Sequence, residues 1–139
     1  MVRFDNGTDQ FQLGLIEYGQ TGSHADALLR LSASAHGFAG SCEAHFLLPD
    51  LLGFARSLQA LQQGGEGSAS LYSLSPHEVE LHLAALDDGQ LALRCSFGQP
   101  IEGSAGRQYW HALSFGFECA ASQLPRALQA DWLQGLLEQ

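Results

Sequence analysis

The sequence predicts an α+β fold, with a largely antiparallel sheet of about six to seven strands and two helices packed on one face. Most of the chain alternates apolar and polar residues with a period of two, which is typical of strands with one buried face. Two segments change to a spacing of three to four, as amphipathic helices do. The order is three strands, a helix, four strands and a helix, and hairpin turns rather than βαβ units join the strands.

The first three strands are expected within residues 11–46. Apolar residues alternate loosely over 11–18, and a polar loop is expected over 21–26. Alternation resumes over 27–34 and, after the His36-Gly37 turn, over 38–46. These last two segments predict a hairpin.

The first helix is expected from Pro49 to Gln62. Proline and an acidic residue suit its first turn, and Gly64-Gly65 would end it. Its apolar stripe is Leu47, Leu51, Phe54, Leu58 and Leu61.

The second half of the chain repeats the strand pattern. A short strand is expected over 69–74, and strands over 79–83 and 91–97 flank an Asp87-Asp88-Gly89 turn. A loop from Gly98 to Arg107 and a strand over 113–119 come next. The chain then forms a helix from Ser122 to Leu137, with its stripe at Leu124, Leu128, Trp132 and Leu136.

Length and composition indicate one self-sufficient domain over residues 1–139. Apolar residues make up 45% of the chain and charged residues 15%, which favours a buried core over disorder. No apolar stretch is long enough to cross a membrane, and the N-terminus shows no secretory signal, so the cytoplasm is the expected compartment. The three cysteines are expected to be buried, reduced thiols.

The charge is strongly acidic, with 15 acidic residues, six arginines, no lysine and a formal net charge of −9. Such a surface repels phosphate backbones and anionic lipid, so nucleic-acid and membrane partners are not expected. It would attract a basic protein. Acidity that serves only solubility is an equally good interpretation of the charge alone.

No catalytic residue, cofactor or metal site is predicted. Glu78, Glu80 and His82 share one strand face, as in a carboxylate-rich metal site, but a solvated strand face explains them better. No phosphate-binding loop and no Gly-x-Ser-x-Gly motif is present. The alternative is a small-ligand or enzymatic domain, which a deep polar cavity containing His82 or His111 would favour.

An aromatic cluster adjoins the longest loop between strands. Tyr109, Trp110 and His111 could anchor an interface, because aromatic side chains dominate interface energetics. Trp110 could equally cover the edge of the sheet.

Most of the chain resembles the WapI-like family of small bacterial immunity-type proteins. The resemblance rests on a hairpin ending at Phe46, the helix entry Leu47-Leu48-Pro49-Asp50-Leu51, the Glu78 to Leu83 alternation, Gly89, and Phe115-Gly116-Phe117 before a Leu-rich helix. It implies a non-catalytic protein that binds another protein, as the name-giving member binds a toxin nuclease. A homo-oligomeric accessory protein is a third hypothesis, and the sequence leaves the oligomeric state open.

The candidate partner-binding residues are carboxylates expected on the sheet face opposite the helices. Arg30 and Arg94 are expected among them, which leaves an excess of negative charge for a basic toxin domain. A merely solvated face is the alternative. The candidate residues are Glu43, Glu78, Glu80 and Glu118, extended to the rim by Asp87 and Asp88.

Overall fold

The computed structural model describes residues 1–138 and, apart from position 21, their side chains. The α+β class is confirmed, but the strands form two four-stranded antiparallel sheets instead of one sheet of six to seven strands. Sheet A contains, in spatial order, β1 (Val2–Asp5), β2 (Gln10–Thr21), β3 (His24–Ala35) and β4 (Phe38–Leu47). Sheet B contains β5 (Ser68–Tyr72), β6 (Val79–Ala85), β7 (Gln90–Glu102) and β8 (Gln108–Ala120).

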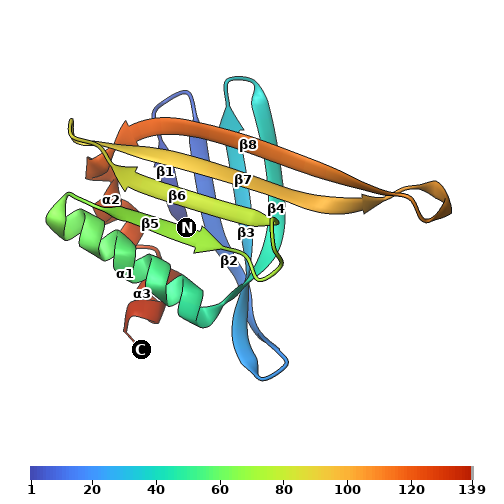
Figure 1. Cartoon of the computed structure of the whole chain (residues 1–139). Coiled ribbons are helices and arrows are strands. Elements are labelled where there is room, and N and C mark those ends of the chain that lie inside the picture. Colours follow the sequence, from blue (N-terminus) through green and yellow to red (C-terminus); the bar gives the residue numbers. More distant parts are fainter. Residues whose placement is uncertain (139) are drawn as a thin grey trace.

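The two sheets pack face to face and cross steeply (Figure 1). Strand β3 contacts β8, and β4 contacts β7. The ring centroids of Phe11 on β2 and Phe115 on β8 are 6.2 Å apart. The predicted single sheet was wrong because alternation shows that each strand has an apolar face and does not show which faces meet.

Three helices gather along one side of this sandwich (Figure 1). They are α1 (Leu48–Gly64), α2 (Leu124–Leu128) and α3 (Asp131–Leu137). Helix α1 contacts β5 and both C-terminal helices, and its predicted residues Leu51, Phe54, Leu58 and Leu61 are all buried. It ends as expected, since Gly65 takes the left-handed conformation (φ 69°) and donates its N–H to Leu61 O at 2.9 Å.

The predicted C-terminal helix is divided. Residues Ala121–Gln123 form a 3₁₀ turn, so Ser122 is not an N-cap, and Ala130 separates α2 from α3 with extended backbone. Leu128 and Leu133 are both buried but lie five residues apart, which does not fit one helical stripe. Trp132, expected in the core, is only half-buried.

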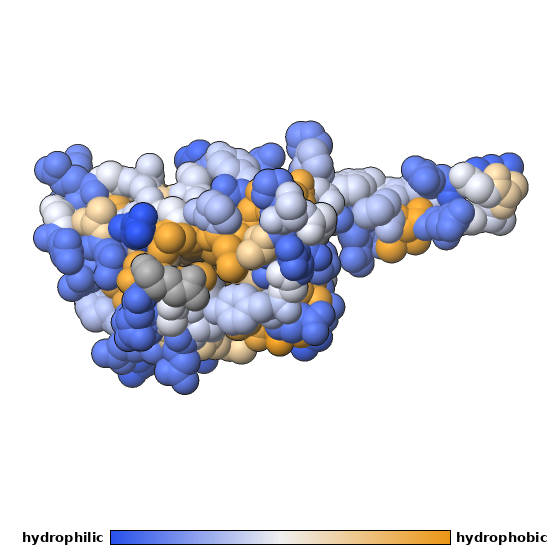
Figure 2. All heavy atoms as spheres, turned by 90° about the horizontal axis from the view of Figure 1, so that it is seen from below, coloured by the Kyte–Doolittle hydropathy of each residue, from blue (hydrophilic) through white to orange (hydrophobic). Residues whose placement is uncertain are grey.

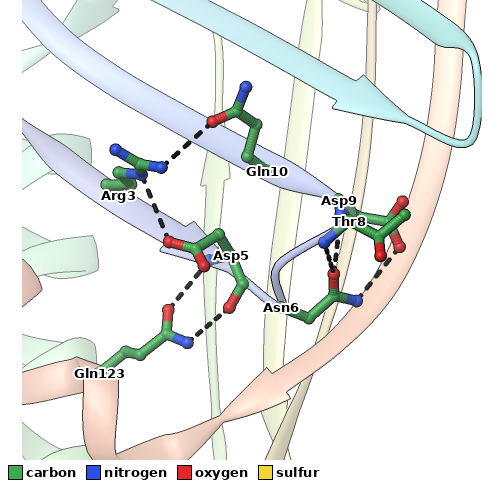
Figure 3. Close-up of polar contacts among 7 residues, drawn as sticks. All are labelled: Arg3, Asp5, Asn6, Thr8, Asp9, Gln10 and Gln123. Carbon is green, nitrogen blue, oxygen red and sulfur yellow. Dashed lines mark hydrogen bonds and ion pairs between the residues drawn. The ribbon is translucent and has the colours of Figure 1, made fainter.

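Strand β1 was not predicted, and polar side chains fix its end (Figure 3). The Gln123 side chain accepts a hydrogen bond from the Asp5 N–H at 2.9 Å and donates one to the Asp5 carbonyl. Asn6 Oδ1 accepts from the N–H groups of Thr8 and Asp9, which closes the β1–β2 turn. The C-terminal segment is therefore tied to the first strand.

Strands β7 and β8 continue far beyond the rest of sheet B as a two-stranded arm, defined here as residues 98–112 (Figures 1 and 2). The predicted loop from Gly98 to Arg107 is therefore wrong, because pairing runs from Gly98↔Ala112 to Glu102↔Gln108. Pro100 argued against a strand there. It is tolerated because β6 pairs with β7 only as far as Phe97, so Pro100 lies on an open edge that needs no N–H donor.

No helix within residues 1–138 is long and apolar enough to span a membrane.

Candidate partner-binding surface

The predicted carboxylates do not share one face. Glu43 lies on the outer face of sheet A, opposite Arg30 on β3, and the two side chains form an ion pair. Glu80 lies on sheet B, where its register partner on β7 is Ser96. The expected single acidic face is therefore divided between two sheets, because β4 and β6 belong to different layers.

Two of the carboxylates lie at the root of the arm. The carbonyl of Glu78 accepts a hydrogen bond from the Gly98 N–H at 2.9 Å, exactly where the arm leaves the body. Glu80 Oε1 is 3.7 Å from Nδ1 of the exposed His77. The charge of Glu78 also affects Cys42 on β4. Burial is the main cause that raises the pKa of the Cys42 thiol to about 12, and the negative charges of Glu78 and Glu43 add to it.

The remaining carboxylates lie at the opposite end of sheet B. Asp87 and Asp88 lie in the β6–β7 turn, and β7 begins just after it at Gln90. Glu118 on β8 lies close to this turn, because its register partner is Ala92 on β7. Glu66 joins them, because the neighbouring Gly67 carbonyl accepts a hydrogen bond from Ala85 at 3.0 Å. We call Glu66, Asp87, Asp88 and Glu118 the acidic end. Within residues 1–138 none of the four forms an ion pair.

Between these two groups the outer face of sheet B is mixed in charge. His82 Nδ1 is 2.9 Å from Ser70 Oγ, and its ring meets the Tyr72 ring edge-on with centroids 5.4 Å apart. Arg94 and Ser96 line an open hollow beside Glu80 and His82. The described residues hold no cluster of three His, Cys, Asp or Glu side chains arranged for a metal ion.

The described interior is apolar. Its buried residues are hydrophobic side chains from both sheets and all three helices, together with Asp9 and Asp26. His82 lies on the outer face of sheet B, and His111 lies on the arm, where it lines an open hollow with β4. Neither histidine lies in a deep polar cavity, which is the feature that would have favoured a small-ligand or enzymatic domain.

The arm carries two exposed aromatic side chains on its opposite faces. Trp110 is 49% exposed and Tyr109 is 57% exposed. A Cβ atom at Gly98 would lie 2.7 Å from Nε1 of Trp110, so the indole leans back over the glycine. The sequence is compatible with Trp110 as an interface anchor or as an edge cover, and the structure places its side chain half-exposed on the arm.

The arm itself is the main feature that sequence analysis missed. A signal was present, because Pro100 and Ile101 on one side mirror Tyr109 and Trp110 on the other, about the Gly103 to Gly106 turn. Pro100 argued against this pairing, because proline is normally excluded from the interior of a sheet and favours a loop prediction.

Two crossed sheets closed by helices around an apolar core define a small α+β sandwich, with carboxylates and aromatic side chains exposed outside the core. A family model described as the immunity protein WapI-like family matches residues 2–136, and the chain belongs to this family. Comparison with curated proteins and comparison with solved structures gave no match.

Proposed function

We propose that this protein is a non-catalytic immunity protein that neutralises a cognate toxin nuclease by binding it. Membership of the WapI-like immunity family, over residues 2–136, is the observation that carries the proposal. Neutralisation by binding requires a surface and no reacting group. An immunity protein against a nuclease acts where nucleic acid is exposed to the toxin, so the proposal places it in the cytoplasm.

The charge distribution supports a basic partner. A nuclease binds phosphate with arginine and lysine side chains, and carboxylates can pair with the same side chains. Our chain has a net charge of −9, and the acidic end has no ion-pair partner within residues 1–138. A field of this sign speeds the encounter with a cationic surface.

Within sheet B, we assign the first contact to Glu78 and Glu80. They lie at the arm root, so a toxin bound there would also reach the aromatic side chains of the arm. Trp110 is a suitable anchor because its indole packs closely over Gly98, and this contact orders the side chain before binding. Asp87, Asp88 and Glu118 at the far end would add long-range attraction, and Glu43 would add less because Arg30 already pairs with it.

The test is toxin rescue combined with binding kinetics. The cognate toxin, to be sought in the neighbouring reading frame, should kill cells when expressed alone and spare them when this chain is co-expressed. Replacing Glu78→Lys together with Glu80→Lys should slow association with the toxin at low salt and flatten its salt dependence. The matched control is Glu17→Lys with Glu138→Lys, which raises the net charge by the same four units at exposed sites away from the arm root.

Wild-type co-expression without rescue would contradict the immunity function itself. If rescue occurs but both double variants associate equally fast, Glu78 and Glu80 are not the first contact. The toxin then binds elsewhere, and Trp110→Ala would test the arm.

A further inference from the structure

Strand β8 ends sheet B with an open edge. Glu118 O faces away from β7, because it accepts a hydrogen bond from Asn6 Nδ2 at 3.2 Å. In an antiparallel ladder the direction alternates, so the even-numbered residues of β8 turn their N–H and C=O groups outward. Within residues 1–138 the Asn6 contact at Glu118 is the one hydrogen bond made to this outward series. The outward groups of residues 108–116 are left open.

The open edge lacks the usual protection against pairing with another strand. Natural edge strands carry proline, lysine or inward-pointing charge. Residues 108–116 contain no proline and no Asp, Glu, Lys or Arg. The other edge of the arm is protected, because Pro100 has no N–H and the Gly98 N–H is bound by Glu78 O. One edge of the same arm is blocked and the other is not.

The inner face of sheet A extends past this edge. Gly40 on β4 lies against the Leu113 side chain of β8. A Cβ atom added to this glycine would be 3.2 Å from Leu113 Cδ2. Phe38 lies two residues further along the same face of β4, and the β3–β4 turn projects beyond β8 (Figure 1). Phe38 is 69% exposed. A strand added to β8 would cover it.

We propose that two copies of this chain dimerise through β8, pairing residues 108–116 antiparallel about a two-fold axis at Ala112. An antiparallel pair of identical strands satisfies the same groups on both copies, as a two-fold interface requires. A centre at Ala112 uses the open stretch from Gln108 to Gly116 and avoids the Glu118 carbonyl, which Asn6 occupies. The two sheets B then form one eight-stranded sheet.

The side chains in this register are complementary. Tyr109 of each copy faces Phe115 of the other on the inward side, where Phe115 is only half-buried in one chain. Trp110 faces Ser114, beside the open hollow lined by Arg94, Ser96 and Gly116. Aromatic pairs across strands stabilise sheets.

A second copy fits this edge better than the basic toxin does. The edge is uncharged from 108 to 116 in a chain of net charge −9, so it offers nothing that selects a cationic partner. No like charges oppose one another in the register. The dimer does not require the carboxylates of β6, but it shares Trp110 of β8 with the toxin-binding proposal. It is therefore tested with the chain alone, so that its failure leaves toxin rescue to be judged separately.

The experiment is sedimentation equilibrium of the full chain from low to high micromolar concentration. We expect a monomer–dimer equilibrium for the wild type. Ala112→Pro removes both central intermolecular hydrogen bonds and no bond to β7, because the Ala112 N–H faces outward. It should weaken the dimer by about tenfold or more. The size-matched control Ala112→Thr keeps the N–H and should dimerise like the wild type.

A second variant guards against local damage by proline. Ala112→Lys keeps the N–H but places two positive charges opposite each other at the axis, and it should also give a monomer. Circular dichroism would confirm that each variant is folded. A wild type that stays monomeric throughout, a dimer that survives both proline and lysine, or a dimer weakened equally by threonine would each overturn the proposal.

Discussion

Cys42, Cys95 and Cys119 lie on the inward faces of β4, β7 and β8 and are free, buried thiols, as the sequence predicted. Burial is the main cause that raises the pKa values of Cys42 and Cys95 to about 12 and that of Cys119 to about 11. Nearby charge adds to this effect, from Glu78 and Glu43 on Cys42 and from Asp5 on Cys119. In the folded protein these thiols therefore remain protonated and poorly nucleophilic at neutral pH.

We expect the free energy of unfolding to fall as the pH rises above about 9. The folded pKa values are raised, so the unfolded chain loses these protons first, from its ordinary value of 9.0, and alkaline pH favours unfolding. The thiol contribution is complete below that value and is lost as the pH approaches 11 to 12. Urea midpoints at pH 7, 9 and 10.5 would measure the fall. A triple Cys→Ala variant should fall less steeply, and parallel curves would contradict the assignment.

At the scale of elements, the helices stabilise the protein by closing one side of the sandwich. Helix α1 buries one face against β5 and the C-terminal helices, and Gln123 ties the segment before α2 to β1. The contacts of α1 with the C-terminal helices and of Gln123 with β1 join segments that are far apart in the sequence. Disrupting the packed face of either helix should therefore lower the stability of the whole domain.

Replacing Leu58→Ala or Leu128→Ala should each lower the free energy of unfolding by about 2–5 kcal/mol, as buried large-to-small changes do. Leu58 is fully buried on α1, and Leu128 is nearly so on α2. Equilibrium urea unfolding would measure the loss. The exposed Ala60→Ser on α1 is a control that should change stability little. Losses near zero at both leucines would mean that neither helix packs as described.

At the scale of the whole molecule, the chain separates a packed body from a projecting arm (Figure 2). No residue from 99 to 111 belongs to the buried core, whereas both strands enter the core on leaving the arm, at Phe97 and Phe117. The carboxylates are also distributed at this scale, with Glu78 and Glu80 at the arm root and the acidic end on the far side. Stability and surface recognition are thus carried by different parts of the molecule.

Replacing residues 100–110 by an Asn-Gly turn should leave the body folded. Gln99 and His111 face each other as a hydrogen-bonded pair, which a two-residue turn can close, and no core residue is removed. We expect Tm to change by no more than about 4 °C, which corresponds to roughly 1 kcal/mol in a domain of this size. Thermal unfolding followed by circular dichroism is the measurement. A variant that fails to fold would show that the arm contributes to the body.

The sequence by itself determined the class of fold, most of the elements and the family resemblance. Local periodicity was sufficient for α1 and its Gly65 end, for the β3–β4 and β6–β7 hairpins, and for the burial of the cysteines. These features depend on residues close together in the chain.

Only the tertiary structure decided how the apolar faces meet and which carboxylates lie together. Period-two alternation is the same for one sheet as for two crossed sheets, so Glu43 could not be separated from Glu80. Pro100 read as a loop residue until the structure showed that its strand lies on an open edge there. The physical reason is that edges and layers depend on contacts between distant segments, which local patterns do not record.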